Sequence, residues 1–76
     1  MRHASLAQAV VLSLVAKDED PLCGRNLTGA EWRGTIRTID SCRRAGWIEG
    51  GERVSEPMRI TDAGRAELAR AIMNAL

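Results

Sequence analysis

Aromatic, histidine and cysteine side chains are scarce in this sequence, and their scarcity excludes several classes of protein. Phe and Tyr are absent, and Trp32 and Trp47 are the two tryptophans. Two cysteines and a single histidine, His3, make a poor zinc site. His3 lies at the N-terminus with no partners of a catalytic triad nearby. We therefore expect no enzyme, no cofactor and no metal ion.

The sequence also shows the pattern of neither a signal peptide nor a membrane span. Residues 6–16 are apolar, but charged residues follow them at once and no small-residue cleavage site is present. The run is too short to span a bilayer. We expect a cytoplasmic protein whose cysteines, Cys23 and Cys42, are reduced, with a disulfide between them as the less favoured alternative.

Lysine is nearly absent, because arginine supplies ten of the eleven basic residues and Lys17 is the only lysine. The planar guanidinium suits phosphates and guanine edges better than an ammonium does, although codon usage in a GC-rich genome produces the same ratio. The net charge is only +1, so no global field draws the chain to nucleic acid.

The length of 76 residues fits a single domain, 1–76, with a thin core. Such a domain is marginal alone or is helped by a partner or a second copy. Residues 4–16 are predicted to form a helix that is central in the packing, because apolar residues recur at three- and four-residue spacing. A buried strand would show a similar run of apolar residues, but the length of this run favours a helix. The recurring positions are Leu6, Val10 and Leu14, with Ala7 and Val11.

A second helical region follows the loop at 21–28. Thr28 with Glu31 three residues later is typical of a capping box, so a helix begins near Thr28. Either one helix runs through Gly34 over 29–45, or the chain breaks at Gly34 and a new helix begins there. We favour the break, although a glycine inside a helix costs only about 1 kcal/mol.

The wheel over 32–45 separates an apolar side from a basic side, and Gly46 is suited to close the helix. The apolar side holds Trp32, Ile36, Ile39 and Cys42, and the other side holds Arg33, Arg37, Ser41 and Arg44. Arg43 lies near the apolar edge, with its guanidinium expected to reach water. We expect both tryptophans to pack in the core.

The C-terminal half is predicted to form a hairpin and a last helix. Residues 47–49 are a strand, 50–57 are the loop and 58–60 are the return strand. Thr61 or Asp62 caps a helix that runs to about residue 74. Its expected apolar stripe is Leu68, Ile72 and Leu76, with Ala69 and Met73. The fold class is thus mostly α with a small β-hairpin (α+β).

Two motifs carry a resemblance to a known family. They are the run from Thr35 through Cys42 to Gly46-Trp47-Ile48, and the run Arg59-Ile60-Thr61-Asp62-Ala63-Gly64-Arg65. Together they resemble the recognition helix, wing and following helix of MarR- and PadR-like transcriptional regulators. The resemblance implies a winged helix-turn-helix with three to four helices and a two-stranded wing. It also implies that residues 34–45 form the recognition helix.

The sequence departs from the family pattern at three points. Little room remains between the first helix and Thr35 for a complete second helix, and Cys42 stands where leucine is usual. The wing is acidic, with Glu49, Glu52 and Glu56 against Arg53. Phosphate contacts favour a basic wing, so this wing points away from DNA or touches a protein.

The resemblance implies double-stranded DNA as the partner of a transcriptional regulator or accessory factor. Residues 33–44 carry a local charge of +3, from four arginines and one aspartate. The alternative is a winged-helix module that binds a protein partner or forms a homodimer without contacting DNA. The expected DNA-binding residues are Arg33, Thr35, Arg37, Thr38, Ser41, Arg44 and Arg53.

Overall fold

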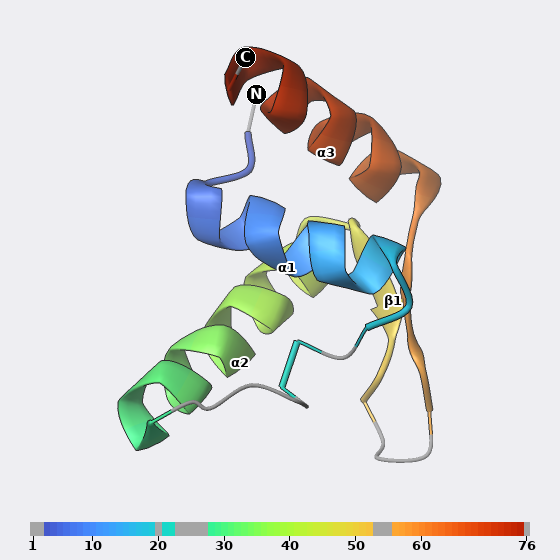
Figure 1. Cartoon of the computed structure of the whole chain (residues 1–76). Coiled ribbons are helices and arrows are strands. Elements are labelled where there is room, and N and C mark those ends of the chain that lie inside the picture. Colours follow the sequence, from blue (N-terminus) through green and yellow to red (C-terminus); the bar gives the residue numbers. More distant parts are fainter. Residues whose placement is uncertain (1–2, 20, 23–27, 53–55, 76) are drawn as a thin grey trace.

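The computed structural model describes residues 3–19, 21–22, 28–52 and 56–75, and shows three helices and a two-stranded hairpin within them (Figure 1). The α+β class is thereby confirmed. The strands pair antiparallel, with Ile48 opposite Ile60 and Gly50 opposite Met58. The elements are α1 (Leu6–Ala16), α2 (Gly29–Arg44), β1 (Ile48–Gly50), β2 (Met58–Ile60) and α3 (Asp62–Ala75).

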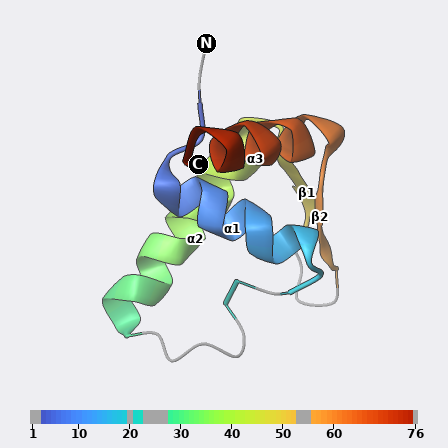
Figure 2. The ribbon, with the colours of Figure 1, turned by 45° about the horizontal axis from the view of Figure 1, so that its top comes forward.

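Helix α1 packs against both α2 and α3 and so occupies the middle of the molecule. Turning the view brings α3 forward over α1 (Figure 2). Ser5 caps the start of α1, because its hydroxyl accepts the Gln8 N–H while the Gln8 side chain accepts the Ser5 N–H. The helix ends before Pro21, at a turn where Asp18 takes a φ of +60°.

Helix α2 is continuous through Gly34, so the predicted break at that residue is wrong. The Thr28 hydroxyl accepts the Glu31 N–H at 3.2 Å and caps the helix, as predicted. Gly34 is exposed, and nothing lies within 4 Å of where a Cβ would stand. Its intrinsic cost of about 1 kcal/mol is offset by this cap and by burial of Ile39 and Cys42 further along.

Gly46 ends α2 with a φ of +82°, as predicted. The Trp47 N–H donates to the Cys42 carbonyl at 3.0 Å, and the Gly46 N–H donates to the Arg43 carbonyl at 3.1 Å. This pair of bonds is a Schellman motif, which satisfies the last carbonyls of the helix. The motif turns the chain directly into β1.

The start of α3 is fastened to the end of α2 by one threonine. The Thr61 N–H donates to the Trp47 carbonyl at 3.0 Å, and its hydroxyl donates to the Gly46 carbonyl at 2.6 Å. The same hydroxyl accepts the Gly64 N–H at 3.0 Å and so caps α3. We call Gly46, Trp47, Thr61 and Gly64 the α2–α3 joint. The joint explains why the Thr-Asp-Ala-Gly sequence follows Gly46 after a stretch of chain just long enough to form the hairpin.

Gly64 is the position in the joint where no side chain fits. It is buried, and an added Cβ would collide with the Trp47 carbonyl and lie 2.8 Å from Ile60 Cγ1. Because the obstacle includes backbone, relief requires α3 to move away from the hairpin.

We predict opposite effects for two glycine-to-alanine substitutions. Gly64→Ala should lower the free energy of unfolding by about 1–3 kcal/mol through overpacking. Gly34→Ala, the matched control, should raise it by about 1 kcal/mol because the added methyl meets nothing. Urea denaturation followed by circular dichroism measures both, and a stabilising Gly64→Ala would contradict the packing described for the joint.

The core lies between α1, the end of α2 and the start of the hairpin. Trp47 is 6% exposed, which confirms its predicted burial, whereas Trp32 is 46% exposed and the prediction of core packing is wrong for it. Trp32 lies in the first turn of α2, which projects beyond the rest of the molecule (Figure 1). The buried apolar residues are Val11, Leu12, Val15, Ile39, Cys42, Trp47 and Ile48.

The apolar stripes predicted for α1 and α3 are only partly used by this core. On α1 the buried residues are Val11, Leu12 and Val15, while Leu6 and Val10 are exposed. On α3, Leu68 packs against the core, but the other described residues of the predicted stripe do not. Ile72, Met73 and Ala69 are exposed, and Leu76 lies outside the described residues.

Glu67 fastens the N-terminal segment to α3. Its carboxylate accepts the Ala4 N–H at 2.7 Å and two guanidinium bonds from Arg70, at 2.7 and 2.9 Å, and His3 Nδ1 lies 3.6 Å away. Arg70 is therefore paired with Glu67. These donors, Arg70 first, hold the pKa of the Glu67 carboxyl at about 2, below its ordinary 4.5.

A lowered carboxyl pKa stabilises the fold above the pKa of the unfolded chain, and this contribution is lost as the pH falls towards the folded value. We therefore expect Glu67→Gln to be less stable than the wild type at pH 7. The difference should shrink between pH 4.5 and 2 and vanish near pH 2. Urea midpoints across this range test the prediction, and a difference independent of pH would contradict it.

Candidate nucleic-acid interface

Three arginines form one exposed row along α2. Arg33, Arg37 and Arg44 fall within about 40° of each other on the helical wheel. All three are exposed, and none makes an ion pair within the described residues. The row spans about 16 Å of helix. We call these three residues the arginine row, and it lies on the side of α2 turned away from the buried Cys42.

Asp40 lies within the length of the arginine row; the sequence interpretation counted its charge but did not place it on the helix. Its wheel position falls between those of Arg33 and Ile36, so it faces solvent between Arg37 and Arg44. Its carboxylate bonds Arg43 Nη1 at 2.9 Å, and the Asp40 side chain remains 46% exposed. A negative charge therefore lies near the middle of the row's length, and the ion pair with Arg43 partly neutralises it.

The hydroxyl residues expected beside the arginines lie elsewhere on α2. Thr35 stands about 160–180° from the arginine row, and Thr38 about 100–140° from it. Their hydroxyls donate to the helix carbonyls of Glu31 and Gly34, each at 2.9 Å. Both threonines are half-buried. The structure thus separates them from the arginines that they were predicted to assist.

Ser41 is occupied by the packing of α2 on α1. Its hydroxyl accepts Gln8 Nε2 at 2.9 Å and donates to the Thr38 carbonyl at 2.8 Å. Both hydrogen-bonding roles of the hydroxyl are thus used inside the protein. Ser41 orients the helix, and the arginine row is left as the part of the predicted site that the structure brings together.

The hairpin contributes more acidic than basic groups. Glu49 and Arg59 face each other across the strands as an exposed pair at 4.0 Å, and Glu52 and Glu56 are exposed. Such an exposed pair contributes little to stability. Arg53, the remaining predicted DNA-binding residue, lies outside the described residues. The described part of the hairpin therefore offers no basic surface to a phosphate.

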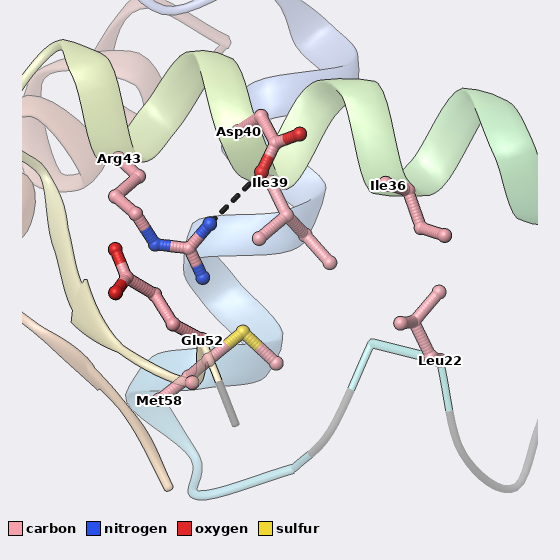
Figure 3. A pocket seen from close by; sticks show the side chains of 8 residues that line it. Leu22, Ile36, Ile39, Asp40, Arg43, Glu52 and Met58 are labelled. Atoms are coloured by element: carbon pink, nitrogen blue, oxygen red, sulfur yellow. Dashed lines mark hydrogen bonds and ion pairs between the residues drawn. The ribbon is translucent and has the colours of Figure 1, made fainter. Parts of the chain in front are cut away.

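A hollow of about 280 Å³ lies between α2, the hairpin and Leu22 (Figure 3). Arg43 crosses one end of it, bonding Asp40 through Nη1 and the Gly50 carbonyl through Nη2 at 3.0 Å. Its Nε is buried and without a partner among the described residues. The lining residues are Leu22, Ile36, Ile39, Asp40, Arg43, Gly51, Glu52 and Met58.

Arg43 therefore connects α2 to the end of β1 rather than reaching into water, and this role was missed. The Asp–Arg spacing of three residues on a helix is a usable signal for the first bond. The second bond, to a backbone carbonyl seven residues away, depends on the turn at Gly46 and has no signal in the sequence. Arg43 helps to fix the angle between α2 and the hairpin.

Cys42 lies on α2 opposite the arginine row and is a free, fully buried thiol. Burial raises its pKa to about 11, against a smaller lowering by a hydrogen bond to Ser41. The thiolate is the reactive form, so this thiol is unreactive in the folded protein. Cys23 lies outside the described residues. Within the part of the chain described, no group of three or more His, Cys, Asp or Glu side chains could hold a metal ion.

We expect alkylation of Cys42 by iodoacetamide at pH 8 to be at least about 100-fold slower in the native protein than in guanidinium. A two-unit rise in pKa alone accounts for that factor, and steric exclusion adds to it. Mass spectrometry of the modified peptides counts Cys42 separately from Cys23. Similar native and denatured rates at Cys42 would contradict the burial described.

Comparisons of the chain with known protein families, curated proteins and solved structures found no match. None of the helices in the described ranges is both long enough and apolar enough to cross a membrane.

Proposed function

We propose that this chain is a small winged-helix DNA-binding protein of the cytoplasm, a transcriptional regulator or accessory factor that places α2 in the major groove. The observation that carries the proposal is the arginine row. Three guanidinium groups that make no ion pair with any described residue project from one side of a helix capped at both ends. The major groove admits an α-helix, and arginine binds both guanine edges and phosphates.

The arrangement of α2 and the hairpin supports the same proposal. The Schellman motif and the Arg43–Gly50 bond hold the hairpin close to the C-terminal end of α2. A hairpin in this place corresponds to the wing of a winged helix. In the described residues α1 is followed directly by α2, so α1 takes the supporting position against the proposed recognition helix.

The charges limit how strongly the protein can bind. Three phosphate contacts release about three counterions, so log K should fall with log salt at a slope near −2.7. Between 50 and 200 mM salt the affinity would fall about 40-fold. Asp40 within the row and the hairpin glutamates weaken binding further. Most of the affinity must come from α2.

The test is a salt series of binding to a fluorescent duplex, followed by anisotropy. Arg37→Ala should weaken binding at every salt concentration and reduce the slope by about 1. Arg65→Ala removes an exposed arginine of α3 and is the matched control. We expect it to leave the slope unchanged, since Arg65 lies on another helix.

Absence of binding to any duplex at 50 mM salt would contradict the proposal. Equal losses in Arg37→Ala and Arg65→Ala would contradict the assignment of binding to α2, because only general charge would then matter.

The second candidate is a winged-helix module that binds a protein rather than DNA. The acidic hairpin, the net charge of +1 and the half-exposed Trp32 favour it. The hollow beside Arg43 could receive a partner's side chain, because its lining includes the apolar side chains of Ile36 and Met58. Failure of DNA binding at low salt would leave this candidate as the better account.

A further inference from the structure

The hollow beside Arg43 has an apolar end and a charged end. Figure 3 places Ile36 and Leu22 at one end, and Arg43 and Glu52 at the other. Ile36 is half-buried, yet it belongs neither to the core nor to the side chains packed against it. Its aliphatic surface is therefore available to a ligand. The volume of about 280 Å³ lies just below the usual range for ligand pockets, about 300–1,000 Å³, so a small ligand fits.

Carboxylates supply the unused hydrogen-bonding groups at the charged end. Glu52 is exposed and makes no ion pair or hydrogen bond with any described residue. Asp40 binds Arg43 through Oδ1 and its side chain remains 46% exposed, which leaves Oδ2 able to accept a hydrogen bond. Glu56 Oε1 lies 3.2 Å from where a Cβ on Gly50 would stand, so a third carboxylate is close to this end. A ligand that enters here meets hydrogen-bond acceptors.

Arg43 offsets only part of this negative charge. Its Nη1 and Nη2 are bonded to Asp40 and to the Gly50 carbonyl, and its Nε is buried, where a ligand cannot reach it. Among the described residues that line the hollow, Arg43 is the one cation, while Asp40 and Glu52 are anions, which leaves a net charge of −1. A bound cation compensates this charge, whereas a bound anion adds to it.

We propose that the hollow beside Arg43 binds an aliphatic ammonium ion. Its carbon chain lies on Ile36 and Met58. Its charged group faces Glu52 and the free Oδ2 of Asp40. An ammonium group has three donors and no acceptor, which suits a site whose unused groups are acceptors. A free alkylamine and a lysine side chain share this chemistry, since each is a flexible chain of methylene groups that ends in a compact positive charge.

This site lies beside the arginine row and does not include it. The four residues of α2 that line the hollow fall within about 100° of each other on the helical wheel, and Asp40 is the one nearest to the row. The guanidinium groups of the row therefore project from the neighbouring side of the helix. The proposal stands independently of DNA binding.

An NMR titration of the full chain at pH 7 and 50 mM salt, with pentylammonium as the probe, tests the proposal. We expect saturable shifts of the backbone amides at 36–43, 50–52 and 58, with a Kd in the millimolar range for so small a ligand. Pentan-1-ol carries the same chain without the charge. Because exposed ion pairs are weak, it should bind about two- to fivefold less tightly. Pentanoate, with the opposite charge, and methylammonium, without the chain, should bind less tightly still.

Two variants separate the contribution of the charge from that of the chain. Glu52→Gln should weaken binding of pentylammonium about two- to fivefold and leave pentan-1-ol unchanged. Ile36→Ala should weaken both ligands, because it removes apolar surface from the hollow. Glu49→Gln is the matched control, since it removes the same charge from the hairpin. Glu49 faces the opposite side of the strands from Met58 and pairs with Arg59. The three replaced side chains lie outside the core, so the variants should fold.

Binding that prefers the cation, is weakened by Glu52→Gln and is unaffected by Glu49→Gln supports the proposal. The absence of saturable shifts up to 50 mM pentylammonium overturns it, and so does equal binding of pentanoate. Equal losses in the two glutamate variants also overturn it, because only general charge then matters.

Nα-acetyl-lysine N-methylamide distinguishes the two sources of the ammonium group. Binding tighter than that of pentylammonium supports the site as one for a lysine of a partner protein, because the peptide groups then add contacts. Equal or weaker binding supports it as a site for a free amine. Failure of both probes to bind overturns the proposal.

Discussion

The joint between the end of α2 and the start of α3 fixes the rest of the architecture. One threonine hydroxyl donates to the Gly46 carbonyl and accepts the Gly64 N–H, while the Thr61 N–H donates to the Trp47 carbonyl. These bonds close the hairpin at its base and bring α3 within contact of the Trp47 backbone. A side chain at position 64 would separate the two. The position of the hairpin beside α2 and the packing of α3 on α1 both depend on this close approach of Gly64 to the Trp47 backbone.

The parts of the fold that were predicted from the sequence are those with local causes. Thr28 and Thr61 cap helices through their own hydroxyls, and Gly46 ends α2 because it takes a positive φ without strain. Burial of Trp47 follows from its place directly after that turn. Each of these signals is contained within a few residues, so no knowledge of the tertiary packing is needed to read it.

The errors arose where a choice depended on tertiary packing. The cost of Gly34 is small beside the burial of Ile39 and Cys42, so α2 continues. Leu6 and Val10 form a valid apolar stripe, but α1 is apolar on several sides and the core uses another one. Thr35 and Thr38 were grouped with the arginines by residue type, although the wheel places them far from the row. The bond from Arg43 to Gly50 had no sequence signal at all.

The molecule presents the arginine row on α2 and four exposed aliphatic side chains on α1 and α3. The arginine row of α2 suits nucleic acid, with Asp40 and the acidic hairpin limiting its strength.

The most direct test of the central claim is NMR of the arginine Nε–H groups during titration with a duplex at 50 mM salt. Our account predicts that the signals of Arg33, Arg37 and Arg44 shift together with the amides of α2, while Arg59 on the hairpin and Arg65 on α3 stay in place. Shifts confined to the hairpin, or no shifts at any arginine, would contradict it.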